Sequence, residues 1–167
     1  LYTAQLPLQH PIAIRYPRGR GVTLNWEKEN RGKYDPIEIG KAKQIKEGSR
    51  IAILSNGFIG NNVIGALEKI TNKDDFAHYD FPFVKPLDEK SLHQIFASFN
   101  SVITIEDGVI TGGFGNAILE FAAANNYHNN VKLLGIPDEF ITHGTVNQLQ
   151  EYCKIDQKSL EIFFSEL

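Results

Sequence analysis

From residue 51 to the carboxyl terminus, short apolar runs alternate with segments whose apolar residues recur every three or four positions. These runs, in which apolar residues predominate, lie at 51–55, 76–84, 102–105 and 131–136. Between and after them the spacing is helical, as in Leu92, Ile95, Phe96 and Phe99. Strands that are apolar on both faces and separated by helices are typical of a parallel sheet covered on both sides. The predicted order over 51–167 is therefore β-α-β-α-β-α-β-α-α.

These elements predict an α/β fold: a three-layer sandwich with a mostly parallel sheet of about five strands and helices on both faces. The fifth strand is expected from 37–39 and 42–45, at an edge and antiparallel. Asp88 and Thr145 are expected to be helix N-caps, because their side chains can accept the free N–H groups of a first turn. Pro82 lies inside the run 76–84, which predicts an edge or a bulge there.

Composition restricts the class of protein. Hydrophobic residues are 42% and charged residues 22% of the chain, as in globular proteins, and no apolar run approaches the ~20 residues of a membrane-spanning helix. The one cysteine, Cys153, excludes an intrachain disulfide and zinc sites with two or four cysteines, and is expected to be a buried small hydrophobe. The five histidines form no His-x-x-x-His pair, so no metal site is predicted.

Charge is distributed unevenly along the chain. Residues 1–50 hold ten of the 17 Lys and Arg but five of the 20 Asp and Glu, whereas 51–167 hold seven and 15. This change in charge balance predicts a junction between two parts of the chain. It also predicts that any anion-binding site lies near the amino terminus. The net charge of -3 argues against a nucleic-acid partner. The chain begins with Leu1, has no methionine and shows no signal peptide, so we expect a piece of a longer protein.

The sharpest single motif is the basic run Arg15-Tyr16-Pro17-Arg18-Gly19. Arginine matches the oxygens of a phosphate in a bidentate way, and a neighbouring glycine lets backbone N–H groups approach an anion. A solvated basic loop or an inter-domain salt bridge explains the run equally well.

Further candidates follow the predicted strands, where open α/β sheets bind their ligands. The glycine-rich stretches 56–60 and 112–115 could cradle a phosphate, but neither is a Walker A or G-x-G-x-x-G motif, and backbone geometry is the favoured explanation. Adjacent Glu106 and Asp107 should point to opposite faces, which argues against a paired-carboxylate site. Asp138 and His143 could form a hydrogen-bonded pair or cap the next helix, and a catalytic role is the less favoured reading.

The order and spacing of six segments resemble one family, the 1-deoxy-D-xylulose-5-phosphate synthases. The segments are 11–19, 37–42, 83–88, 104–108, 112–120 and 135–144. The resemblance implies a transketolase-like, thiamine-diphosphate-dependent transferase. Such an enzyme condenses pyruvate with glyceraldehyde 3-phosphate, releases CO₂ and serves isoprenoid, thiamine and pyridoxal synthesis. It also implies Mg²⁺, a homodimer of three-domain subunits, small-molecule substrates, no nucleic acid, no membrane and a cytoplasmic location.

Within this resemblance the chain is the third domain and the end of the second. Residues 1–22 would end the pyrimidine-binding domain, 23–36 would be a linker, and 37–167 would be the transketolase C-terminal-like domain. The groups that activate the cofactor and bind the metal would then lie outside this sequence. No catalytic, cofactor-binding or metal-binding residue is therefore assigned, no cofactor is expected to bind this chain, and the chain alone is expected to be inactive.

The resemblance also assigns roles to individual residues. Arg18 matches the position that binds the phosphate of the acceptor, and Arg15 is a less direct helper. Asp138 and His143 lie in a family motif and are possible residues of the active-site edge. Two alternatives stay open. One is the same domain of a transketolase or of a 2-oxoacid dehydrogenase β subunit, and the other is a stand-alone, non-catalytic interaction module.

Overall fold

The computed structural model describes residues 1–7, 10–17 and 34–167, which form two compact units, Leu1–Ile39 and Gly40–Leu167. The first unit holds one short 3-10 helix, η1 (Thr3–Gln5), among its described residues. There the hydroxyl of Thr3 accepts the N–H of Ile37 at 2.8 Å. The rings of Tyr2 and Tyr34 lie 6.1 Å apart. The predicted linker, 23–36, falls largely outside the described residues.

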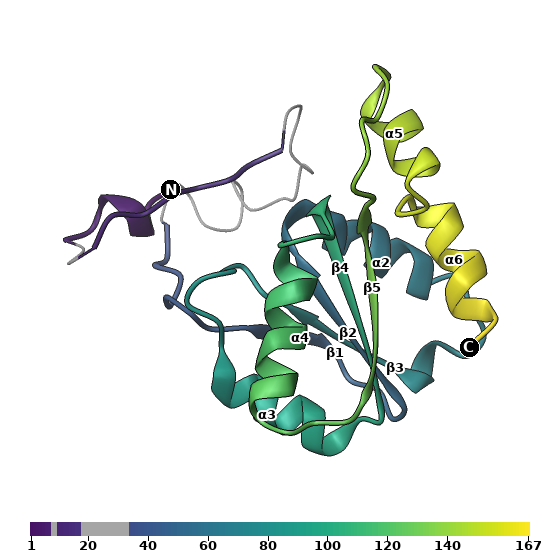
Figure 1. The fold of residues 1–167 in the computed structure, drawn as a ribbon, viewed down its shortest axis with the longest axis horizontal. Coiled ribbons are helices and arrows are strands. Elements are labelled where there is room, and N and C mark those ends of the chain that lie inside the picture. The colour runs from purple at the N-terminus through teal and green to yellow at the C-terminus, as the bar shows by residue number, and fades with distance from the viewer. Residues whose placement is uncertain (8–9, 18–33) are drawn as a thin grey trace. The chain divides into compact units, whose positions relative to one another are not determined.

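The second unit is an α/β domain (Figure 1). Its elements are β1 (Lys43–Lys46), β2 (Ile51–Asn56), η2 (Gly57–Ile59), α2 (Gly60–Leu67), η3 (Lys73–Asp75), β3 (Phe76–Asp80), α3 (Glu89–Ser98), β4 (Ser101–Val109), α4 (Phe114–Ala124), β5 (Asn130–Ile136), α5 (Val146–Tyr152) and α6 (Gln157–Ser165). The sheet has the order β1-β3-β2-β4-β5, and only β1 is antiparallel to its neighbour. The predicted fold class is confirmed, and each predicted helix and strand from residue 51 onward exists.

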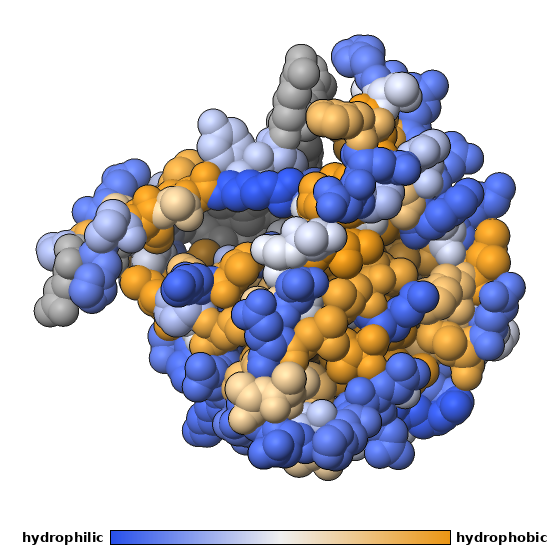
Figure 2. Space-filling model, in the orientation of Figure 1, coloured by the Kyte–Doolittle hydropathy of each residue, from blue (hydrophilic) through white to orange (hydrophobic). Residues whose placement is uncertain are grey.

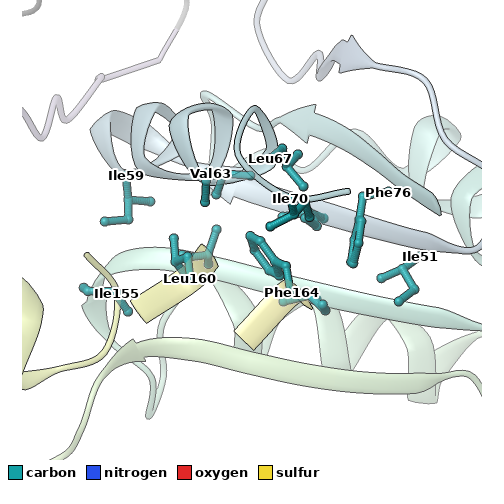
Figure 3. Packing of buried hydrophobic residues seen from close by; sticks show 13 residues of the cluster. Ile51, Ile59, Val63, Leu67, Ile70, Phe76, Ile155, Leu160 and Phe164 are labelled. Atoms are coloured by element: carbon teal, nitrogen blue, oxygen red, sulfur yellow. The ribbon is translucent and has the colours of Figure 1, made fainter. Parts of the chain in front are cut away.

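Two apolar cores lie on opposite faces of this sheet, because successive side chains of a strand point to opposite sides. On one face, Ile51 and Ile53 of β2 pack against α2 and α6. Figure 3 shows Val63 and Leu67 of α2 directed toward Leu160 and Phe164 of α6. On the other face, Ala52 and Leu54 of β2 pack against α3 and α4. The central strand is therefore buried on both sides, as the apolar residues at 51–54 predict.

The edge strand β1 differs from the prediction in its extent. Residues 37–39 belong to no strand, and the pairing with β3 covers Lys43 to Lys46 with an irregularity between Gln44 and Lys46. β3 is also shorter than predicted, ending at Asp80. Pro82 follows the strand instead of interrupting it, so the prediction of an edge or bulge there is wrong. The chain leaves the sheet at Phe81, whose C=O accepts the side-chain amide of Asn56 at 2.6 Å.

Asp88 caps α3, as predicted, and also connects that helix to the start of β1. Its carboxylate accepts the N–H of Ser91 at 3.1 Å and the N–H of Ala42 at 3.0 Å. Burial acts to raise the pKa of Asp88, but these hydrogen bonds and the ammonium of Lys41 outweigh it, so the pKa is lowered.

No helix in the described part of the chain has the length and apolar character needed to cross a membrane.

Candidate functional site

The four parallel strands bring polar residues to one edge of the sheet, where their carboxyl ends meet. In register, Ser55 lies beside Asp80 and Asn56 lies beside Glu106. Burial raises the pKa of Asp80, and Lys43 opposes this shift. This edge is where ligands bind in open α/β sheets, so each of its polar groups was a candidate.

The buried carboxylate of Glu106 is bound to the chain itself. One oxygen accepts the N–H of Phe114 and the other accepts the N–H of Gly115, both at 2.9 Å. These N–H groups open α4, whose N-cap residue, Gly113, has no side chain to serve them. Glu106 therefore supplies from β4 the negative charge that a helix N-terminus favours.

The glycines around Glu106 are required by close packing. A Cβ on Gly113 would collide with the Glu106 carboxylate and the Val109 carbonyl, and a Cβ on Gly115 would lie 2.6 Å from the hydroxyl of Thr104. Gly112 has a φ of +72°, which favours glycine. At this turn the favoured explanation, backbone geometry, is confirmed. The position that a phosphate would occupy is taken by the protein's own carboxylate.

A serine–histidine pair lies beneath the same edge. The hydroxyl of Ser55 and Nε2 of His78 are 2.8 Å apart, and both residues are fully buried. A Cβ on Gly60 would lie 2.8 Å from that hydroxyl, so α2 closes over the pair. Nucleophilic catalysis needs access for a substrate, which is absent here. The pair is a buried polar contact between β2 and β3, and burial lowers the pKa of His78 to about 4.

This shift predicts a specific acid sensitivity. The ordinary pKa of 6.5 applies to His78 in the unfolded chain, against about 4 in the folded chain. Below pH 6.5 the unfolded state therefore takes up a proton that the folded state does not. The contribution of His78 to the free energy of unfolding is therefore complete above pH 6.5. As the pH falls from 6.5 toward 4, that free energy decreases by about 3 kcal/mol. Denaturant unfolding at several pH values measures it.

His78→Gln is the matched control for this prediction. Carboxylates titrate in both proteins and cancel in the difference, so the free energy of unfolding should fall more steeply with acid in the native chain than in the variant. Parallel pH dependences would contradict the assignment.

Asp138 and His143 lie in the loop between β5 and α5, and both side chains are exposed. No hydrogen bond or ion pair joins them among the residues that the structure describes, so the pair that their spacing allowed does not form. Neither caps α5. Thr145 is the N-cap of α5, in a capping box with Gln148, which confirms the prediction for this residue. The assignment of Asp138 and His143 to the edge of an active site stays a prediction.

Of the two arginines proposed to bind phosphate, only Arg15 lies within the described residues. Arg15 is an exposed residue of the first unit. Arg18, the predicted phosphate ligand, lies outside the described residues. Within 1–7, 10–17 and 34–167, no three His, Cys, Asp or Glu side chains gather into a group that could hold a metal ion. Cys153 ends α5, is partly buried, and packs against the core beneath β5.

Sequence reasoning missed the role of Glu106, although a signal was present. If the glycines of the turn at 112–113 lie before the helix, the residue that precedes its first turn has no side chain to accept an N–H. Its free N–H groups must find an acceptor elsewhere, and a buried carboxylate at the end of the preceding strand is the nearest source. The Ser55–His78 pair has no comparable signal, because its residues lie in different strands.

Comparisons with known proteins agree with this architecture. Residues 40–160 match the family model "Transketolase, C-terminal domain". A 1-deoxy-D-xylulose-5-phosphate synthase of Bacteroides thetaiotaomicron is 45% identical over 162 residues, covering 96% of this chain and 24% of the relative. The synthase of Cytophaga hutchinsonii is 46% identical, over 96% and 25%. The chain thus spans about a quarter of the length of these curated relatives.

Solved structures support the fold. A split-gene transketolase, described as an inactive beta4 tetramer, superposes with a TM-score of 0.70 at 22% identity, covering 79% of this chain and 43% of the other. A transketolase from Campylobacter jejuni superposes with a TM-score of 0.55 at 17% identity, covering 77% and 19%. Together, the sheet order, the two helical layers and the match over residues 40–160 place this chain in the transketolase C-terminal domain family.

Proposed function

We propose that this chain is the carboxyl-terminal part of a 1-deoxy-D-xylulose-5-phosphate synthase. The observation that carries the proposal is the identity of 42–46% to synthases from several bacteria over 96% or more of this chain. The whole enzyme would join pyruvate to glyceraldehyde 3-phosphate, with loss of CO₂, to give 1-deoxy-D-xylulose 5-phosphate. Thiamine diphosphate, when bound, would supply the carbanion chemistry, and the protein would orient the substrates.

The cofactor would be held by other parts of the enzyme. The N-terminus of α4, a natural place for a diphosphate, is occupied by Glu106. No metal-holding group occurs within the described ranges. We therefore derive no catalytic step from this domain. Its proposed contribution is to support the active site from outside, with the basic run that contains Arg15 and Arg18 as the point of contact with substrate phosphate.

A substrate comparison tests the proposal. A protein of the relatives' full length that carries this sequence should form product from pyruvate and glyceraldehyde 3-phosphate in the presence of thiamine diphosphate and Mg²⁺. It should not accept a ketose-phosphate donor or transfer to a lipoyl group. Preference for either of those would favour the transketolase or the 2-oxoacid dehydrogenase alternative, and activity with none of them would favour the non-catalytic module. The 167-residue chain alone should be inactive.

The finer properties are proposals as well. The whole enzyme would require Mg²⁺, act as a homodimer and work in the cytoplasm. Removal of divalent ions with EDTA should abolish activity, and added Mg²⁺ should restore it. Light scattering on the full-length protein should give the mass of two subunits. A monomer with full activity would contradict the dimer.

Substitution of Arg18 tests the proposed phosphate contact. In the full-length enzyme, Arg18→Ala should raise the KM for glyceraldehyde 3-phosphate about 30-fold, because losing a charge-assisted hydrogen bond costs roughly 2 kcal/mol. The KM for pyruvate, which has no phosphate, should change little. Arg20→Ala, in the same basic stretch, is the control and should leave both KM values near their original level. Equal increases for the two substrates would remove Arg18 from the phosphate site.

A further inference from the structure

Strand β5 is the open edge of the sheet. The sheet ends with β5, and no strand in the described part of the chain pairs with its outer side. Asn130 donates to the C=O of Asn100 and Ile136 accepts from Ile110, both on the side of β4. The backbone groups of successive strand residues point to opposite sides. The N–H and C=O groups of Val131 and Leu133 therefore point outward, where another strand could pair with them.

A surface groove accompanies this edge. It has a volume of about 360 Å³ and lies between β5 and the turn that joins α5 to α6. Lys132 and Leu134 of β5 line it from the strand, and Tyr152, Cys153 and Lys154 line it from the turn. Figure 2 shows hydrophobic residues at the surface over β5 and toward α6. The groove thus combines an apolar wall with unpaired backbone groups, which is the requirement for an added strand.

The charges of the groove are opposite to those of its domain. Residues 51–167 hold 15 Asp and Glu but seven Lys and Arg, yet two of those seven, Lys132 and Lys154, line the groove. The carboxylate that lines it, Glu139, is engaged by the hydroxyl of Tyr152 at 2.8 Å. An acidic partner would be repelled by most of the domain and attracted here.

Lys154 also occupies an unfavourable backbone position. It follows the end of α5 with a φ of +59°, where glycine is the usual residue. A lysine at this φ makes the backbone less stable than a glycine would. Its side chain lines the groove, which is a reason for a lysine at this position. Together with Lys132 on the facing strand, it defines which charge the groove accepts.

We propose that the outer edge of β5 binds an extended segment of a partner protein that carries acidic side chains at alternate positions. Alternate side chains of an added strand lie on one face, so they would meet Lys132 and Lys154 together while the backbone pairs with Val131 and Leu133. A second copy of this chain is a poorer occupant, because two-fold pairing would bring both lysines of each copy into one interface. This interaction goes beyond the proposed synthase activity.

The experiment uses the 167-residue chain and a fluorescent eight-residue peptide of alternating glutamate and threonine. Anisotropy should show saturable binding, and Lys132→Glu or Lys154→Glu should weaken it at least tenfold. Lys158→Glu, an exposed lysine of α6 outside the groove, should change the affinity less than twofold. A peptide with alternate N-methylated amides should not bind, and the amides of Val131 and Leu133 should gain protection from hydrogen exchange in the complex.

Lys154→Gly separates the binding role from a structural one. Because glycine suits the positive φ, this variant should melt a few degrees higher, roughly 3 °C, while binding the peptide at least fivefold more weakly. Several outcomes would overturn the proposal. These are no saturable binding to the native chain, an equal effect of Lys158→Glu, or equal binding of the N-methylated peptide. A dimer of this chain in sedimentation, with the amides of Val131 and Leu133 already protected from hydrogen exchange, would overturn it as well.

Discussion

Replacing Glu106 by alanine should lower the free energy of unfolding by about 4 kcal/mol. The substitution removes two hydrogen bonds that the N–H groups at the start of α4 donate to a carboxylate, each worth roughly 1.5–3 kcal/mol. Both N–H groups would be left buried beside a cavity, since Gly113 and Gly115 pack closely around the missing side chain. Denaturant unfolding followed by circular dichroism measures the loss.

Two further variants make this prediction specific. Glu120→Ala removes an exposed glutamate from the same helix and should change the free energy of unfolding by less than about 0.5 kcal/mol. Glu106→Gln keeps one acceptor oxygen and should lose roughly half as much as the alanine variant. If Glu106→Ala were as stable as Glu120→Ala, the carboxylate would not be the cap of α4.

The second large effect is expected in the core between the sheet and its outer helices. Phe164 of α6 is fully buried, and its ring lies 5.4 Å from that of Phe76 in β3. Figure 3 shows it between α2 and the sheet. Phe164→Ala should therefore cost about 4 kcal/mol, because it removes a large apolar side chain and leaves a cavity. The transition in denaturant should shift to a lower midpoint with little change in slope.

Ile162→Ala is the control on the same helix. Ile162 is 55% exposed, so its truncation should cost less than about 1 kcal/mol. Equal losses for the two variants would mean that α6 does not pack on the sheet through Phe164. A loss below about 1 kcal/mol for Phe164→Ala would mean the same.

The elements from residue 51 onward were predictable because their apolar residues repeat with the period of the structure. β2 is apolar over residues 51–54 and buried on both faces there, and α3 buries Leu92, Ile95 and Phe96, the residues whose spacing predicted it. The ends of strands were less predictable. β3 ends at Asp80, and the side chain of Asn56 donates to the C=O of Phe81 just after it, a contact between distant residues that local sequence does not reveal.

The site was harder to predict than the fold. Glycine-rich turns predict tight backbone geometry, but which group fills the helix N-terminus depends on how β4 and α4 meet. Asp138 and His143 are close in sequence, yet their loop turns both side chains to solvent, so proximity along the chain did not produce a pair. The burial that lowers the pKa of His78 comes from β2 and α2, which a single histidine in a sequence does not indicate.

The loop from 137 to 145 is held at both ends while its tip is exposed. Glu139 is bound by Tyr152, Thr145 is fixed by its capping box, and Phe140 between them is fully exposed. A residue that touches nothing can be exchanged at no cost to the fold. Position 140 is therefore a natural attachment point for a spectroscopic label, and a dye placed there would report on approaching molecules without disturbing the domain that carries it.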